Sequence, residues 1–215
     1  MGNSLDRKVL HKLSYGLYVV TTAFNGRLNG QIADAIMQVN AQPEQTVAVS
    51  LNNDNFTCEL VKQSGKLAIS VLSTAYDKEV IANFGFNSGR DMDKFAAFPP
   101  KISENGLPYY EGPGFCGWLE GPVIEQLTVG SHTIFVVRAE AGTVGAEAAG
   151  PLIYADYLQA KRQPAAAPKP EPEAAPEPKR KGYRCDVCGY IEYGEIGPDY
   201  RCPICGVGPE HFVEI

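Results

Sequence analysis

The sequence has no run of apolar residues approaching the roughly 18 that a membrane-spanning helix requires. It also has no excess of positive charge, because 19 lysines and arginines stand against 25 aspartates and glutamates, a net charge of −6. Neither a membrane nor a nucleic acid is therefore an expected partner. The N-terminal residues 1–13 lack the apolar segment of a signal peptide, so we expect a cytoplasmic protein that meets proteins or small molecules.

Cysteine is scarce outside the C-terminal end of the chain. Of six cysteines, four lie in residues 185–205, and the other two, Cys58 and Cys116, are isolated. Thiols that cluster in a reducing compartment indicate a bound metal rather than disulfides. The two isolated cysteines are predicted to be buried structural thiols.

A proline-rich segment divides the chain in two. Residues 163–181 contain six prolines and no large apolar side chain, which predicts an extended, semi-rigid tether. The predicted organisation is a domain over residues 1–160, a linker over 161–182 and a small domain over 183–215. The linker carries six basic and three acidic residues, whereas the small domain carries two basic and six acidic ones.

Strand patterns dominate the first domain. The predicted strands cover residues 18–24, 31–39, 46–51, 67–72, 123–127 and 133–144, with a hairpin turn at Asn25-Gly26. Short helices are predicted over residues 5–14, over 55–63 with Asn55 as the N-cap, and over 77–84 with Asp77 as the N-cap. This pattern favours a mainly β fold, a closed or split β-barrel with a few helices. A Rossmann fold is disfavoured because no Gly-x-Gly-x-x-Gly follows the first strand.

The C-terminal cysteines form two Cys-x-x-Cys pairs separated by thirteen residues, and they are Cys185, Cys188, Cys202 and Cys205. This spacing can place four thiolates on a tetrahedron, with Gly189 and Gly206 free to take a positive φ after each pair. Backbone N–H groups of such turns point at the sulfurs. A domain this small must draw much of its folding energy from the metal. The geometry accepts zinc as well as iron.

The residues around these pairs resemble a rubredoxin, the one-iron electron carrier, over nearly the whole tail. The resemblance rests on Tyr183, Tyr190, Tyr193 and Phe212 around the cysteines, and it implies that these aromatic residues form the small core. The short spacing is similar to that of the compact rubredoxin module of rubrerythrins, and the usual core tryptophan is missing. The resemblance implies a redox iron, with a zinc ribbon as the alternative.

Several motifs of the first domain occur in a characteristic order. They are the segment from Asn29 to Ala35, Pro43 before residues 46–52, Thr57 at a helix start, Ser64-Gly65, the segment from Phe84 to Phe95, and Gly130 to Phe135. Together they resemble the flavin reductase family over about residues 8–158. That family implies a split β-barrel, usually a homodimer, that binds FMN.

A phosphate group and an isoalloxazine ring need different surroundings. The helix start at residues 55–57 offers N–H donors and a hydroxyl to the phosphate, with Arg90 and Lys94 as countercharges. Residues 31–35 offer backbone groups to the ring, although the Asp34 carboxylate would disfavour an anionic reduced flavin. The expected cofactor residues are Asn29, Gln31, Ile32, Ala33, Asp34, Ala35, Ser50, Leu51, Asn52, Asn55, Thr57, Ser88, Gly89, Arg90, Lys94 and His132.

His132 is the expected catalytic residue, as a donor to flavin or nicotinamide rather than as an obligatory acid. The resemblance implies this role, and a structural histidine is the alternative. Tyr154 and Tyr157 are candidates to cover the ring, with core packing as the other interpretation.

The two halves together predict an electron-transfer enzyme. A flavin accepts two electrons at once from NADH or NADPH and can release them singly, whereas an iron held by four thiolates takes one at a time. The whole chain resembles the high-molecular-weight rubredoxins, which implies as acceptor a flavo-diiron protein that reduces oxygen or nitric oxide, or a rubrerythrin-like protein. Two alternatives stay open: a flavin reductase that releases reduced FMN and carries a zinc-bound tail, and a non-enzymatic FMN carrier.

Overall fold

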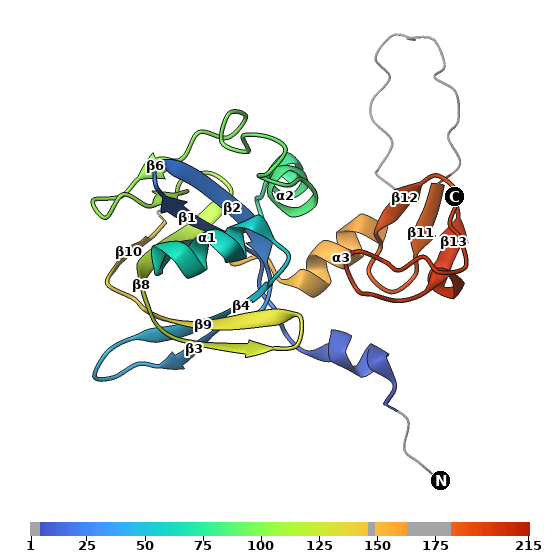
Figure 1. Ribbon diagram of the computed structural model, residues 1–215, viewed down its shortest axis with the longest axis horizontal. Coiled ribbons are helices and arrows are strands. Elements are labelled where there is room, and N and C mark those ends of the chain that lie inside the picture. The colour runs from blue at the N-terminus through green and yellow to red at the C-terminus, as the bar shows by residue number, and fades with distance from the viewer. Residues whose placement is uncertain (1–4, 146–148, 163–181) are drawn as a thin grey trace. The chain divides into compact units, whose positions relative to one another are not determined.

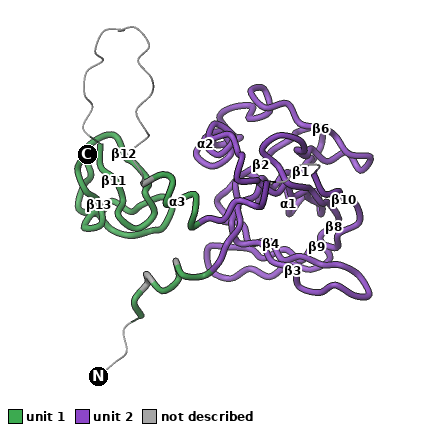
Figure 2. Tube along the Cα trace, turned by 180° about the vertical axis from the view of Figure 1, so that it is seen from behind, with its two compact units in different colours: residues 1–13, 155–215 green, residues 14–154 purple. Residues whose placement is uncertain are grey.

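A computed structural model describes residues 5–145, 149–162 and 182–215 of the protein. The chain divides into two compact units, Ser14–Tyr154 and the combination of Met1–Leu13 with Ala155–Ile215 (Figure 2). Apart from its first two residues and its last, the predicted linker over 161–182 lies outside the described residues. Within the described ranges, no helix is both long enough and apolar enough to cross a membrane.

The larger unit is built on an antiparallel sheet of eight strands in the order β2-β1-β5-β8-β9-β4-β3, with β10 paired to β8 (Figure 1). The strands are β1 (Tyr18–Phe24), β2 (Arg27–Ala33), β3 (Ile36–Asn40), β4 (Thr46–Asn52), β5 (Lys66–Leu72), β8 (Phe115–Val129), β9 (His132–Arg138) and β10 (Ala141–Val144). A separate hairpin joins β6 (Lys101–Ile102) to β7 (Pro108–Tyr109).

The long strand β8 turns this sheet into a split barrel. Its first part, from Phe115 to Pro122, pairs with β5, and its second part, from Val123 to Val129, pairs with β9. The register shifts between Val123 and Glu125, where a bulge lets the strand bend from one half of the sheet to the other. The two halves enclose the core, as the sequence predicted.

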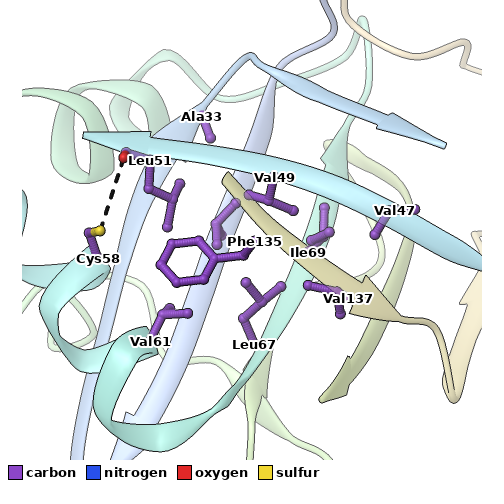
Figure 3. Packing of buried hydrophobic residues seen from close by; sticks show 11 residues of the cluster. Ala33, Val47, Val49, Leu51, Cys58, Val61, Leu67, Ile69, Phe135 and Val137 are labelled. Carbon is purple, nitrogen blue, oxygen red and sulfur yellow. Dashed lines mark hydrogen bonds between the residues drawn. The ribbon is translucent and has the colours of Figure 1, made fainter. Parts of the chain in front are cut away.

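Alternating side chains from both halves fill the barrel interior. Figure 3 shows Phe135 and Val137 of β9 meeting Leu67 and Ile69 of β5 across the core. The helix α1 (Phe56–Ser64) packs against β1, β2 and β5, and it adds Cys58 to the same cluster. Cys58 is therefore buried as predicted. The prediction is wrong for Cys116, which is only half-buried.

Both predicted N-cap residues precede a helix, but only Asp77 caps its helix through the side chain. The helix α2 (Lys78–Phe86) begins after Asp77, whose side chain accepts a hydrogen bond from the N–H of Glu79 at 2.9 Å. The helix α1 ends at Gly65, which has a φ of 64°. Asn55 precedes α1, but its side chain makes no capping hydrogen bond, so first-turn N–H groups are left for another acceptor.

Several sequence predictions of secondary structure are wrong in detail, including the strand over residues 123–127, which is only part of the longer β8. The strand predicted over residues 31–39 is broken at Asp34-Ala35 into β2 and β3, because the chain changes from one half of the sheet to the other there. The strand over residues 133–144 is likewise divided into β9 and β10. The first helix is a 3-10 helix, η1 (Arg7–Lys12), and α3 (Tyr154–Arg162) was not predicted. The Asn25-Gly26 turn is confirmed, with φ values of 49° and 77°.

The C-terminal module, residues 182–215, has three short strands in the order β12-β11-β13. They are β11 (Gly182–Cys185), β12 (Ile191–Tyr193) and β13 (Phe212–Glu214), with the 3-10 helix η2 (Pro209–His211) before the last strand. The core contains the cysteines, Val207 and the partly buried Tyr190 and Phe212. Tyr193 is 64% exposed, so its predicted place in that core is wrong.

Candidate functional site

Four sulfur atoms converge in the C-terminal module. The Sγ atoms of Cys185, Cys188, Cys202 and Cys205 all lie within 4.8 Å of one another. The Cys185–Cys205 pair is 3.7 Å apart and the Cys188–Cys202 pair 3.5 Å apart. The first three cysteines are buried and Cys205 is half-buried. Four soft donors at these separations fit one thiophilic ion such as iron or zinc.

Each Cys-x-x-Cys pair folds into a tight turn that ends on glycine. The N–H of Gly189 donates to the carbonyl of Cys185 at 2.9 Å, and the N–H of Gly206 donates to that of Cys202 at 2.8 Å. Both glycines have a positive φ, 78° and 69°, which a residue with a Cβ would adopt only at a cost. The sequence therefore predicted this geometry residue by residue.

Backbone N–H groups also point at the sulfurs. Burial raises the pKa of the Cys188 thiol, and the N–H of Tyr190 partly offsets this. At Cys202 burial raises the pKa, but the N–H groups of Cys205 and Ile204 and the thiols of Cys188 and Cys205 oppose it, and the net effect is a lowered pKa. Such dipoles stabilise thiolate charge and would tune a redox metal.

A carboxylate joins the two halves of the C-terminal module. Glu192 Oε2 accepts hydrogen bonds from the hydroxyls of Tyr200 at 2.6 Å and Tyr190 at 3.0 Å. The bond from Tyr200 lowers the pKa of the Glu192 carboxyl. Because Tyr190 follows the first cysteine pair and Tyr200 precedes the second, this contact holds the short intervening loop. Sequence reasoning missed Glu192 and Tyr200, since spacing alone does not show which side chains meet.

In the larger unit, three predicted cofactor residues meet at the start of α1. Asn29 of β2 is 2% exposed and donates through Nδ2 to the Oγ1 of Thr57, which is 1% exposed, at 3.0 Å. Gly89, from the loop after α2, approaches so closely that a Cβ there would lie 2.0 Å from Asn29 Oδ1. The strand, the helix and the loop are thus fixed together at this point.

Arg90 lies beside the same helix start. Its Nη1 donates to the carbonyl of Asp54 at 3.1 Å, and its Nη2 forms an ion pair with Glu59 at 2.8 Å. The hydroxyl of Ser88 accepts the N–H of Arg90 at 3.1 Å and supports the loop. Arg90 and Ser88 therefore belong to the loop that approaches Asn29 at Gly89, and their predicted contact with a phosphate stays a prediction.

Lys94 has surroundings different from those expected. It is 4% exposed, and its ammonium donates to the carbonyls of Gly30 at 3.0 Å and Phe84 at 3.2 Å. Burial lowers the pKa of this ammonium to about 8. The side chain anchors the loop to β2 and α2, and these contacts argue against the predicted role of a phosphate countercharge.

The region predicted for the flavin ring contains an unsatisfied buried atom. Gln31 is 8% exposed, and its Oε1 has no hydrogen-bond partner among the described residues. A buried acceptor left unpaired costs about 1–3 kcal/mol, which points to a donor on a ligand. Ala33 is buried and Ile32 and Ala35 are half-buried along the same segment.

Strand pairing brings the remaining predicted residues to one corner. Asn52 of β4 is opposite His132 of β9, and the N–H of Ser50 donates to the carbonyl of Ala35 at 3.0 Å. Leu51 lies between them with its side chain in the core, so only its backbone is available. The imidazole of His132 is exposed, and Ser131 Oγ is 2.9 Å from its Nδ1.

Asp34 is electrostatically linked to this corner. Burial raises the pKa of the Asp34 carboxyl, against the smaller lowering effects of the N–H groups at Asp34 and Ala35 and of His132. Tyr154 and Tyr157 lie in α3, half-buried, and Tyr157 falls in the smaller unit. Their predicted contact with the ring stays a prediction.

A cavity of about 530 Å³ lies between the β1–β2 turn and the loop after α2. Its walls include Arg27, Leu28, Arg90, Asp91, Met92 and Asp93. Arg27 was not predicted. It contacts the loop through Nη2, which donates to the carbonyl of Gly89 at 2.9 Å, and only the tertiary fold reveals this.

Comparisons with known proteins agree with both halves. The sequence matches the flavin reductase like domain family over residues 10–160 and the rubrerythrin, rubredoxin-like domain family over residues 183–213. A high molecular weight rubredoxin of Moorella thermoacetica is 35% identical, over 98% of this chain and 100% of that protein. A ferric-chelate reductase (NAD(P)H) of Archaeoglobus fulgidus is 37% identical, over 74% of this chain and 92% of that protein. An FMN-binding protein from Thermus thermophilus with bound 1-cyclohex-2-enone has a TM-score of 0.58 at 24% identity, over 66% of this chain and 78% of that one.

The strand order and the family match define the larger unit as a flavin reductase-like split barrel. The four sulfurs and the second family match define a rubredoxin-like module. Both are parts of an oxidoreductase that transfers electrons. The chain belongs to the high molecular weight rubredoxin family, in which the two are joined in one polypeptide. The predicted fold class and both resemblances are confirmed.

Proposed function

We propose that this protein oxidises NADH or NADPH and passes the electrons through FMN to an iron held by its own four cysteines, and then to a partner redox protein. The observation that carries the proposal is that one chain contains a flavin reductase-like barrel and a site of four converging sulfurs. The Archaeoglobus relative named as an NAD(P)H-dependent reductase supports the choice of electron donor. The Thermus protein of the same fold supports FMN.

The residues present fit FMN at the start of α1 and at the β2–β3 corner. Asn55 and Thr57 would hold the phosphate through N–H groups and a hydroxyl, with Ser88, Gly89 and Arg90 closing the other side. The uncapped first turn of α1 and the unpaired Gln31 Oε1 are the two observations that support this fit. Bound FMN would supply the change from two-electron to one-electron transfer.

His132 is proposed as the hydrogen-bond donor at the ring, and Asn52, directly opposite in the sheet, as its neighbour. Burial raises the pKa of the Asp34 carboxyl, and the N–H groups of Asp34 and Ala35 oppose this by stabilising the carboxylate. Asp34 therefore has no proposed contact with the reduced ring. The backbone of residues 31–35 would then orient the ring edge.

Iron is proposed for the C-terminal site because the surrounding residues match the rubredoxin-like family over residues 183–213. Cys185, Cys188, Cys202 and Cys205 would be its ligands, and the backbone N–H groups directed at the sulfurs would stabilise the ligand charge. The domain division at residues 1–160, 161–182 and 183–215 is part of this proposal.

The acceptor is proposed to be a flavo-diiron or rubrerythrin-like protein with a basic docking face. Residues 183–215 carry six acidic residues and two basic ones, so complementary charge would steer the encounter. Electron transfer to the partner should slow as ionic strength rises, because salt screens this attraction.

We also propose a homodimer formed through one face of the barrel. Met37 and Val39 on the edge strand β3 and Ile124, Leu127 and Val129 on β8 are exposed apolar side chains. The double variant M37K/L127K should turn a dimer into a monomer in light-scattering measurements. The control V144K, which changes an exposed apolar residue on β10, should leave the mass unchanged.

Anaerobic stopped-flow spectroscopy tests the electron path. When NADH or NADPH is mixed with the full-length protein, the flavin band should bleach first and the iron–thiolate band afterwards. The variant C202S should lose only the second phase, and the control C116S should keep both. An iron band that never bleaches would show that internal transfer is wrong.

Two other outcomes would favour the alternative functions. Zinc in the tail would favour a reductase that releases reduced FMN. Failure of both NADH and NADPH to reduce the flavin would favour a flavin carrier.

A further inference from the structure

Two guanidinium groups share one aromatic ring at the edge of the 530 Å³ cavity. The Cζ of Arg27 lies 4.3 Å from the centroid of the Phe56 ring, and the Cζ of Arg90 lies 5.0 Å from it. The two cations therefore cannot be farther apart than the sum of these distances. Phe56 is buried as the first residue of α1, so the ring is a fixed support for both.

The charges of this pair are only partly matched. Arg90 is paired with Glu59, whereas Arg27 forms no ion pair within the described residues and, besides its contact with the Phe56 ring, donates from Nη2 to the carbonyl of Gly89. Arg27 is exposed and is one of the residues that line the cavity. A guanidinium held by stacking with free N–H groups is a preorganised site for a phosphate oxygen.

The loop from Gly89 to Phe95 adds carboxylates and apolar surface to the cavity beside the two arginines. Asp91 and Asp93 line it, and Met92 and Leu28 add apolar surface. Asp93 accepts the N–H of Phe95 at 2.9 Å, which fixes this carboxylate within the loop. Carboxylates repel a phosphate but accept hydrogen bonds from ribose hydroxyls, and a methionine packs well against a flat base. A phosphate alone would not need these groups, whereas a nucleotide offers ribose hydroxyls to a carboxylate and a flat base to apolar side chains.

We propose that this cavity binds the adenosine 5′-phosphate group of a dinucleotide, with Arg27 on the phosphate and Asp91 on the ribose hydroxyls. The cavity volume lies within the usual range of about 300–1,000 Å³ for small-molecule sites. The proposal rests on the proposed function, because it names where that function holds the adenylate half of its electron donor. The same chemistry occurs in the adenylate half of FAD, and the experiment separates the two sources. Since carboxylates oppose a 2′-phosphate, NADH should bind better than NADPH.

Isothermal titration calorimetry of the FMN-loaded full-length protein with AMP tests the site directly. AMP should bind, and R27Q should weaken its binding about tenfold, the loss expected for one charge-assisted contact of about 1.4 kcal/mol. The control is R138Q, because Arg138 is a surface arginine on β9 that does not line the cavity. That control should change the AMP affinity by less than twofold. Absence of AMP binding at millimolar concentration would overturn the proposal.

Two further measurements identify the source of the adenylate. If R27Q raises the KM for NADH and leaves the FMN affinity unchanged, the site serves the pyridine nucleotide. If it weakens FAD relative to FMN and leaves the KM for NADH unchanged, the site serves FAD. Equal weakening of FMN and AMP would overturn the proposal, because the cavity would then hold the flavin's own phosphate. AMP binding needs neither hydride transfer nor iron, so it can succeed even where the proposed electron path fails.

A second variant keeps the test informative if R27Q does not fold, which the fluorescence of Trp118 in β8 would reveal. D91N removes a negative charge from the cavity wall. This variant should lower the preference for NADH over NADPH, measured as the ratio of the two affinities, severalfold. An unchanged ratio would contradict the placement of Asp91 at the ribose.

Discussion

Replacement of Lys94 by methionine should remove a pH-dependent part of the barrel's stability. The ammonium of Lys94 is buried between β2 and α2 with two carbonyls as partners, and its pKa falls from 10.5 to about 8. The unfolded chain therefore binds more protons than the folded one between these two pH values. Stability must then rise with pH across this window, as the penalty on the buried charge is relieved.

The size of this effect follows from the shift. A difference of roughly 2.5 pKa units corresponds to about 3 kcal/mol if the full shift is realised. The variant K94M leaves the carbonyls of Gly30 and Phe84 without their donor, which costs a constant amount at every pH. The pH-dependent part of the difference between wild type and variant therefore belongs to Lys94.

Denaturant unfolding at pH 7, 8, 9 and 10 measures this difference. The chain has one tryptophan, Trp118 in β8, so its fluorescence follows the barrel and not the C-terminal module. Thiols and tyrosines that titrate in the same range contribute equally to both proteins and cancel. The wild type should gain stability relative to K94M above pH 8. Parallel curves over the whole range would show that the Lys94 ammonium is not buried as described.

Three other substitutions test the two sites. C202S should abolish binding of the ion and unfold the C-terminal module. Metal analysis would then show loss of the ion, and NMR spectra would show loss of the dispersed amide signals of the module. C116S should keep the ion and these signals. T57V should weaken FMN binding about tenfold in fluorescence titrations, because Asn29 loses its acceptor and the phosphate loses a hydroxyl; unchanged affinity would place the phosphate elsewhere. Y200F should speed removal of the metal by a chelator severalfold, since Glu192 then loses the hydroxyl that precedes the second cysteine pair, and an equal rate would show that this contact does not hold the loop.

The metal site could be predicted almost completely from the sequence because it is local. The spacing of the cysteines and the glycine after each pair determine two short turns, and the structure brings the four sulfurs together as expected. The hairpin at Asn25-Gly26 succeeded for the same reason. A structural feature can be predicted from the sequence when the residues that determine it lie within a few positions of one another.

The flavin corner depends on contacts between distant segments, and the sequence predicted it less well. Only one turn-favouring residue, Asp34, marks the break at Asp34-Ala35, which arises where the chain passes from one half of the sheet to the other. Lys94 looks like any surface lysine until the fold buries it. Arg27 is 29 positions from Phe56 and 63 from Arg90, so only the packed structure reveals their shared ring.

The close approach of Gly89 to Asn29 has a consequence for engineering this scaffold. Asn29 cannot easily withdraw, because its amide is buried and bonded to Thr57. Even alanine at position 89 would displace the side chain that joins strand, helix and loop. A mutant library aimed at new cofactors or donors should therefore keep glycine at this position and diversify Asp91 and Met92, which line the cavity.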